Sequence, residues 1–131
     1  MLVQEYVDEL MSPLESGKTL RNAAIIEIID GSVLAASSGF PKWLEPSEFQ
    51  VLNACLDNVR LPSWSLGGTQ YITSDNNGDV LVGRNIQGGA VAKKLQAKLI
   101  ALIGIFEDPV TQEECVMLVQ KVSANLVKNG Y

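Results

Sequence analysis

The last part of the chain carries the clearest structural signal, an amphipathic helix with a marked start. Thr111 and Glu114 have the spacing of a capping box, in which the hydroxyl and the carboxylate each accept a hydrogen bond from a backbone amide. Glu113 and Glu114 favour the positive end of this helix, and Gly130 can end it. Its apolar residues form one stripe, namely Cys115, Leu118, Val119, Val122 and Leu126. Such a helix needs an apolar surface to pack against, so we expect it to cover a sheet.

Short strands and two further helices account for the rest of the chain. Apolar residues recur at spacings of three and four in residues 2–11 and in residues 46–56, which predicts a helix in each. Runs of strand-forming residues between turn signals predict strands at 23–29, 32–37, 66–73, 80–84, 90–94 and 99–106. The expected turns are Asp30-Gly31, Asn76-Asn77-Gly78 and Gln87-Gly88-Gly89. This order predicts an α+β fold, with an antiparallel sheet packed between helices.

Length and charge narrow the classes of function. The 131 residues fit one compact domain spanning residues 1–131. No apolar run approaches the roughly 18 residues that a membrane span needs, and the first residues lack a secretory leader, so we expect a cytoplasmic protein. Cys55 and Cys115 fall on the apolar sides of predicted helices, where we expect buried free thiols. The net charge of −5 argues against broad binding to nucleic acid.

The sequence offers no constellation of residues for catalysis. Histidine is absent, which excludes Ser-His-Asp and Cys-His centres and histidine metal ligands. The Gly88-Gly89 pair is not followed by the Gly-Lys-Ser/Thr of a phosphate-binding loop. Asp75, Asn77 and Asp79 alternate like the start of a calcium loop, but the later glycine and the distal glutamate are missing. We therefore expect no enzyme, no cofactor and no metal site.

One motif within this pattern points to a family. The stretch Leu66-Gly67-Gly68-Thr69-Gln70-Tyr71 lies between an opening Tyr6-Val7-Asp8-Glu9 and the stretch Glu107-Asp108-Pro109-Val110-Thr111 before the last helix. That order and spacing resemble profilin, a family of small actin-monomer-binding proteins, along essentially the whole chain. The resemblance implies a central antiparallel β-sheet with the N- and C-terminal helices on one face and a further helix on the other. It also implies a monomer that acts in the cytoplasm, on the cytoskeleton.

The resemblance implies a surface for monomeric actin. In the family this surface comprises the end of the middle helix, the central strands and the start of the last helix. The corresponding residues are Asn53, Leu56, Gln70, Thr73, Arg84, Glu113, Val116 and Gln120. Several family members carry lysine at the Gln70 position and arginine around Asp75, so the charge complementarity is reduced. Leu56 fits packing in the core as well as it fits an interface.

Binding of this kind regulates polymerisation in the family. It inhibits spontaneous nucleation and pointed-end addition, permits delivery to barbed ends, and can promote nucleotide exchange on actin. Exchange would follow from conformational coupling in actin, without chemistry by the protein itself.

Profilins also bind proline-rich segments, such as those of formin-like partners, on an aromatic cluster between the terminal helices. Flat rings suit the ridges of a polyproline helix. The corresponding residues are Val3, Tyr6, Leu34, Asn125 and Tyr131. Val3 and Leu34 stand where the family usually has tryptophan, and Asn125 stands where it has histidine or tyrosine. We therefore expect weak or altered binding of polyproline.

Basic residues gather in one acid-free stretch of the sequence. Residues 80–106 contain no acidic residue but hold Arg84, Lys93, Lys94 and Lys98. These residues fit either a solvated hairpin face or a patch that docks an acidic surface or a phosphate head group. Phosphoinositide binding is common in the family, and here it would depend on these four residues.

Two other interpretations remain open. The stretch around Asp30-Gly31 is also similar to roadblock and longin domains, which dimerise and regulate small GTPases. Those domains lack the Leu-Gly-Gly-Thr-Gln-Tyr strand and the Asp-Pro-Val-Thr entry to the last helix. A PAS-like sensor of small ligands would need a hollow apolar pocket, and the sequence offers no cofactor anchor. Binding of monomeric actin remains the principal hypothesis, with the roadblock or longin module as the alternative.

Overall fold

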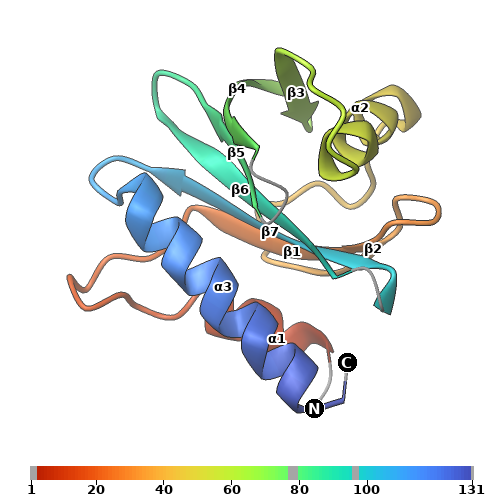
Figure 1. Cartoon of the computed structure of the whole chain (residues 1–131). Helices are drawn as coiled ribbons and strands as arrows, with labels where there is room; N and C mark the ends of the chain where they lie inside the picture. Colours follow the sequence, from red (N-terminus) through yellow and green to blue (C-terminus); the bar gives the residue numbers. More distant parts are fainter. Residues whose placement is uncertain (1–2, 77–79, 96–97, 131) are drawn as a thin grey trace.

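The structure, a computed structural model, describes residues 3–76, 80–95 and 98–130. Its strands form one antiparallel sheet in the order β2-β1-β7-β6-β5-β4-β3 (Figure 1). The helices are α1 (Val3–Leu10), α2 (Pro46–Leu56) and α3 (Gln112–Lys128). The strands are β1 (Asn22–Glu27), β2 (Val33–Ala36), β3 (Ser63–Leu66), β4 (Thr69–Asn76), β5 (Leu81–Arg84), β6 (Gly88–Leu95) and β7 (Ile100–Glu107).

Strands β6 and β7 form the centre of the sheet. They pair without interruption from Gly88–Glu107 to Leu95–Ile100. Both strands are apolar and rich in small residues, and most of their residues are buried on one face of the sheet or the other. A sheet with such a centre needs cover on both faces.

Two layers of helices supply this cover, as the resemblance implied. Helices α1 and α3 lie together on one face of the sheet, and α2 lies on the other (Figure 1). The α3-side core includes Tyr6, Leu10, Ile25, Leu102, Val119 and Leu126. The α2-side core includes Ile26, Leu52, Trp64, Tyr71, Leu81 and Ile103. The predicted α+β arrangement is therefore confirmed.

The predicted start of the last helix is confirmed in atomic detail. The Thr111 hydroxyl accepts a hydrogen bond from the Glu114 amide at 3.1 Å, and a Glu114 carboxylate oxygen accepts one from the Thr111 amide at 3.0 Å. The helix then lies close to the sheet, because Gly104 of β7 has no side chain beneath it; a Cβ there would lie 3.1 Å from Val119 and 3.2 Å from Cys115.

Both predicted free thiols are buried. Cys55 of α2 and Cys115 of α3 form no disulfide, and burial raises the pKa of each thiol.

The prediction of a single strand over residues 66–73 is wrong in one respect. Gly67 and Gly68 have positive φ angles of 58° and 85°, so the chain reverses there and forms a β3–β4 hairpin. The Glu48 carboxylate of α2 accepts hydrogen bonds from both glycine amides, at 3.0 and 2.8 Å, and ties this turn to the helix. The sequence analysis therefore missed β3.

Other boundaries also differ from the expectations. Gly88 and Gly89 belong to β6, where the sequence predicted a bend. Strand β1 ends at Glu27, and Ile29 is 68% exposed in the turn that follows. Most of the turn expected at 76–78, together with Asp79 of the calcium-like pattern, lies outside the described residues.

Replacing Thr111 with alanine tests the cap. We expect Thr111→Ala to lower the free energy of unfolding by about 1 kcal/mol, since it leaves a helix amide without its acceptor. Thr19→Ala is the matched control, because Thr19 is exposed in a loop, and its effect should stay within about 0.5 kcal/mol. Urea denaturation measures both, and equal losses would contradict the role of the cap.

Candidate functional site

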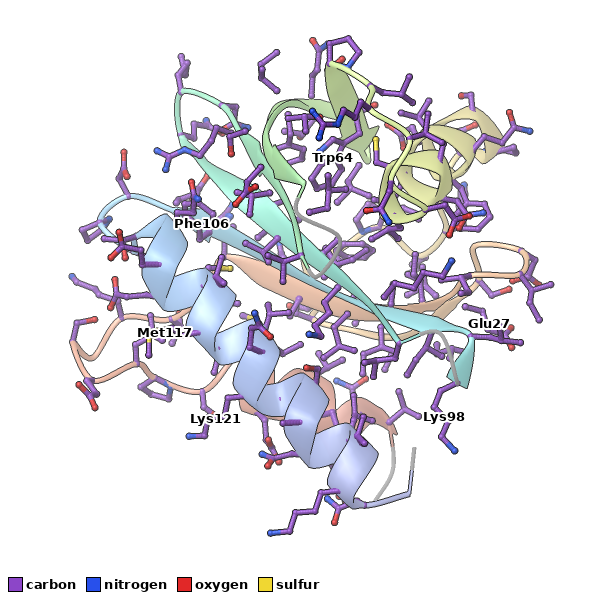
Figure 2. All side chains as sticks on the ribbon, in the orientation of Figure 1. Glu27, Trp64, Lys98, Phe106, Met117 and Lys121 are labelled. Carbon is purple, nitrogen blue, oxygen red and sulfur yellow. The ribbon has the colours of Figure 1, made fainter. Side chains whose placement is uncertain are left out.

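Arg84, at the end of β5, lies beside the first turn of α3. Its guanidinium carbon is 5.6 Å from the ring centroid of Phe106, which Figure 2 labels near the start of α3. Its Nη1 also donates a hydrogen bond to Gln112 Oε1 at 3.3 Å. The aromatic face and the amide oxygen hold this exposed cation in place. Arg84 is thus a charge with a defined position on the surface.

Strand β4 continues the surface around Arg84. Ile72 pairs with Arg84 across the β4–β5 ladder, so both side chains lie on the α3 side of the sheet. Gln70 shares that side by strand alternation. Helix α3 packs on β6 and β7, and Ile72 remains 59% exposed. Ile72 and Arg84 thus place an exposed apolar side chain beside a cation of fixed position.

Helix α3 provides the other half of this surface. Gln112, Val116 and Gln120 follow one another at intervals of four and are half-buried. Lys93 of β6 donates a hydrogen bond to Gln120 Oε1 at 3.0 Å, so this row of α3 faces β5 and β6. Glu113 is exposed next to it. We call this surface the β4–α3 face; its residues are Gln70, Ile72, Arg84, Glu113, Val116 and Gln120.

The structure brings five of the eight residues proposed for actin onto the β4–α3 face, and the sequence analysis missed Ile72. Its signal was the alternation of β4, in which Tyr71 is buried and residues 70 and 72 are exposed. That pattern puts an apolar side chain on the solvent side of a strand.

The other three residues lie on the α2 side of the sheet. Thr73 pairs with Gly83 and shares the face of Tyr71. Within the described part of the chain its buried hydroxyl has no hydrogen-bond partner. Leu56 packs against the α2-side core, and Asn53 is half-buried on the same helix.

The residues proposed to bind polyproline lie around α1. Those of them that the structure describes expose no aromatic ring. Tyr6 is 0% exposed, and Val3 packs against the α3-side core. Asn125 Nδ2 donates a hydrogen bond to Glu9 Oε2 at 3.2 Å. Leu34 of β2 is 45% exposed, and Tyr131 lies outside the described residues.

The four basic residues do not form one patch. Lys93 and Lys94 are neighbours in β6, so their side chains leave opposite faces of the sheet. Lys94 forms an ion pair with Asp57 at the end of α2, whereas Lys93 bonds to Gln120 of α3. Lys98 lies at the far end of the sheet from Phe106 (Figure 2).

Comparison with known proteins identifies the family. The profilin family model matches residues 1–131, and the chain belongs to the profilin family. Among solved structures, Schizosaccharomyces pombe profilin is 30% identical, with 98% of each chain covered and a TM-score of 0.78. Acanthamoeba castellanii profilin IB is 24% identical over 98% of each chain, with a TM-score of 0.79. LokiProfilin2, solved in a complex with rabbit actin, is 19% identical over 96% of each chain, with a TM-score of 0.75. The predicted profilin-like fold is therefore confirmed.

The described residues contain neither a helix suited to span a membrane nor a cluster of side chains suited to bind a metal ion. Over residues 3–76, 80–95 and 98–130, no helix is both long and apolar enough to cross a bilayer. The same residues contain no group of three or more cysteine, aspartate or glutamate side chains that could hold a metal ion.

A double-mutant cycle tests the ion pair between Lys94 and Asp57, which makes the Lys94 charge unavailable to another anion. The Lys94 side chain is 14% exposed and that of Asp57 is 52% exposed, so solvent screens the pair only in part. We expect Asp57→Ala and Lys94→Ala to couple by about 0.5 kcal/mol or more in urea denaturation. Asp57→Ala with Lys98→Ala is the matched control and should show no coupling. A null result for the first pair would mean that Lys94 is available to another anion.

Proposed function

We propose that this profilin binds monomeric actin through the β4–α3 face. The observation that carries the proposal is the match of the profilin family model to residues 1–131. The structures of LokiProfilin1 and LokiProfilin2 with rabbit actin support it, because both share this fold, with TM-scores of 0.73 and 0.75. At 20% and 19% identity they support the fold rather than individual contacts.

Each residue of the β4–α3 face has a distinct role in this proposal. Ile72 is the apolar anchor, because its 59% exposed side chain would lose water on contact. Arg84 supplies a charge whose position the Phe106 ring and Gln112 fix before binding, which lowers the entropy cost of the contact. Val116 extends the apolar centre, while Glu113, Gln70 and Gln120 form a polar rim.

The proposed effect on actin is steric and conformational. A protein seated on the surface that joins monomers blocks spontaneous nucleation and pointed-end addition. Delivery to the barbed end of a filament remains open, because the incoming monomer joins that end through its opposite, pointed-end surface, which stays uncovered. Faster nucleotide exchange would follow if binding favours an actin conformation with a more open cleft. No chemical step by the profilin is needed.

The three α2-side residues have a smaller part in the proposal. Asn53 and Leu56 could meet actin only around the β3 edge of the sheet, and Leu56 already packs against the core. The Thr73 hydroxyl is buried, so we do not expect it to contact actin. Thr73 would affect binding only by helping to position the neighbouring Ile72.

Proline-rich and lipid ligands are secondary in this proposal. A polyproline helix needs exposed rings, and the Tyr6 ring is buried. The Asn125 amide is already bonded to Glu9. For phosphoinositides, Lys94 leaves the opposite face of β6 from Lys93, and Lys98 lies at the far end of the sheet from Phe106 and Arg84, so a head group beside Arg84 would not meet all four cations. We infer weak or altered binding of polyproline and no strong phosphoinositide site on the four basic residues.

A pyrene-actin assay tests the main proposal. Excess wild-type protein should slow spontaneous assembly, whereas Ile72→Ser and Arg84→Gln should each weaken binding about tenfold, equal to about 1.4 kcal/mol. Ile29→Ser is the matched control, because Ile29 is 68% exposed in a turn away from this face. No slowing by the wild-type protein would exclude actin binding. If the protein also dimerised on a sizing column, the roadblock or longin alternative would be favoured.

A proline-decamer column tests the inference on polyproline. The wild-type protein should elute with little retention, because neither Val3 nor Asn125 offers a ring to the ligand. A WW domain run on the same column shows that the resin is active. Firm retention of the wild-type protein would overturn the inference and require the Tyr6 ring to become exposed on binding.

A further inference from the structure

A polar cleft lies at the end of the sheet where β1 begins and β7 ends. Its volume is about 300 Å³, at the small end of the range for ligand sites. The polar side chains that line it come from separate elements, and the argument uses Arg21, Asn22, Tyr71, Asn85 and Glu107. Tyr71 belongs to the α2-side core, and none of these five residues belongs to the β4–α3 face.

Tyr71 is the buried polar group of this cleft. Its side chain is 3% exposed, and its ring packs against Trp64 with centroids 5.2 Å apart. Burial, helped by the negative charge of Glu107, raises the pKa of Tyr71 to about 12. The phenol therefore stays protonated at neutral pH and can donate a hydrogen bond. Within the described residues its hydroxyl donates to no protein acceptor and, unlike the Thr73 hydroxyl, it is not closed off from solvent, so it faces the cleft.

Two amide side chains in the cleft have unused donors as well. Asn22 Oδ1 accepts a hydrogen bond from the Ser37 hydroxyl at 2.8 Å. Asn85 Oδ1 accepts two, both at 3.0 Å, from the amides of Gln87 and Gly88. Both oxygens are thus occupied, whereas the Nδ2 groups donate to no acceptor in the part of the chain that the structure describes. The cleft therefore offers three neutral donors.

The charges of the cleft cancel. Arg21 Nε lies 3.7 Å from Glu107 Oε1, and both side chains are partly exposed at the rim. An ionic ligand would be attracted by one of these side chains and repelled by the other, so the pair favours neither sign of charge. A neutral ligand fits this balance. It must carry oxygen atoms that accept from the three donors and a hydroxyl that donates to the Glu107 carboxylate.

We propose that this cleft binds a small neutral polyol of monosaccharide size. A polyol meets all the requirements, because each hydroxyl both donates and accepts a hydrogen bond. The site would be independent of the proposed actin surface, since Tyr71 and Ile72 leave opposite faces of β4. A bound polyol would accept a hydrogen bond from the Tyr71 hydroxyl in place of solvent in the cleft.

Tryptophan fluorescence can report on the proposed site. The chain has two tryptophans, and Trp43 is 71% exposed, whereas Trp64 is 2% exposed and contacts Tyr71. In a Trp43→Phe background the emission comes from Trp64 alone. Titration with glucose, ribose or glycerol should then give a saturable change. Backbone amide NMR shifts should change around Asn22, Asn85 and Glu107.

Tyr71→Phe is the decisive variant, because it removes only the hydroxyl. In the Trp43→Phe background it should weaken polyol binding about 3- to 10-fold, as expected for one lost hydrogen bond. Tyr6→Phe is the matched control, since it makes the same change in the α3-side core and should leave polyol binding unchanged. Glu107→Gln replaces the charged acceptor at the rim by a weaker, neutral one and should also weaken polyol binding. It gives a second test if thermal unfolding shows that Tyr71→Phe is not folded.

The outcomes separate this proposal from the proposed function. The polyol proposal is overturned if none of the three polyols gives a saturable change in Trp64 fluorescence. It is also overturned if the Tyr71→Phe variant binds the polyols as tightly as the protein with Tyr71. Binding of sulfate in place of the polyols also overturns it, because the site would then favour anions. Pyrene-actin assembly in Tyr71→Phe should match the wild type, so failure of the polyol site leaves the actin result unaffected.

Discussion

The pairing of β6 with β7 is the interaction on which the rest of the structure depends. Their ladder runs without a bulge from Gly88–Glu107 to Leu95–Ile100 and occupies the middle of the sheet. Most residues of both strands are apolar and buried on one face or the other, so each face must be removed from water. The sheet centre thereby requires cover on both faces, which α1 and α3 supply on one side and α2 on the other.

The two layers give the two faces of the sheet different properties. On the α3 side, the small Gly104 allows α3 to approach β7, and the first turn of α3 reaches Arg84 and Phe106. Helix α3 is too narrow to cover β4, which leaves Ile72 exposed. On the α2 side, Glu48 binds the β3–β4 turn, and a cleft lined by strand ends and loops lies at the end of the sheet. An exposed apolar surface therefore forms on one face and a polar cleft on the other.

Much of this fold could be predicted from local patterns in the sequence. The Thr111 and Glu114 cap is confirmed because its chemistry involves residues only three positions apart. Strand β3 was missed because the reversal at Gly67 and Gly68 depends on the sign of two φ angles, which apolar periodicity does not encode. Likewise, the basic residues were grouped by position in the sequence, although strand alternation sends Lys93 and Lys94 to opposite faces.

The candidate site was less predictable, because it depends on strand register. Gln70, Ile72 and Thr73 are close in sequence, but only the first two face α3, and a one-residue shift would exchange Ile72 for Thr73. The register is fixed upstream by the glycine turn and downstream by the irregularity between Thr73 and Asp75. The turn thus acts on the candidate site through geometry: with Gly67 and Gly68 reversing the chain, an isoleucine rather than a threonine stands beside Arg84. The same register buries Tyr71, so the composition of the apolar surface and that of the polar cleft are set by a single turn.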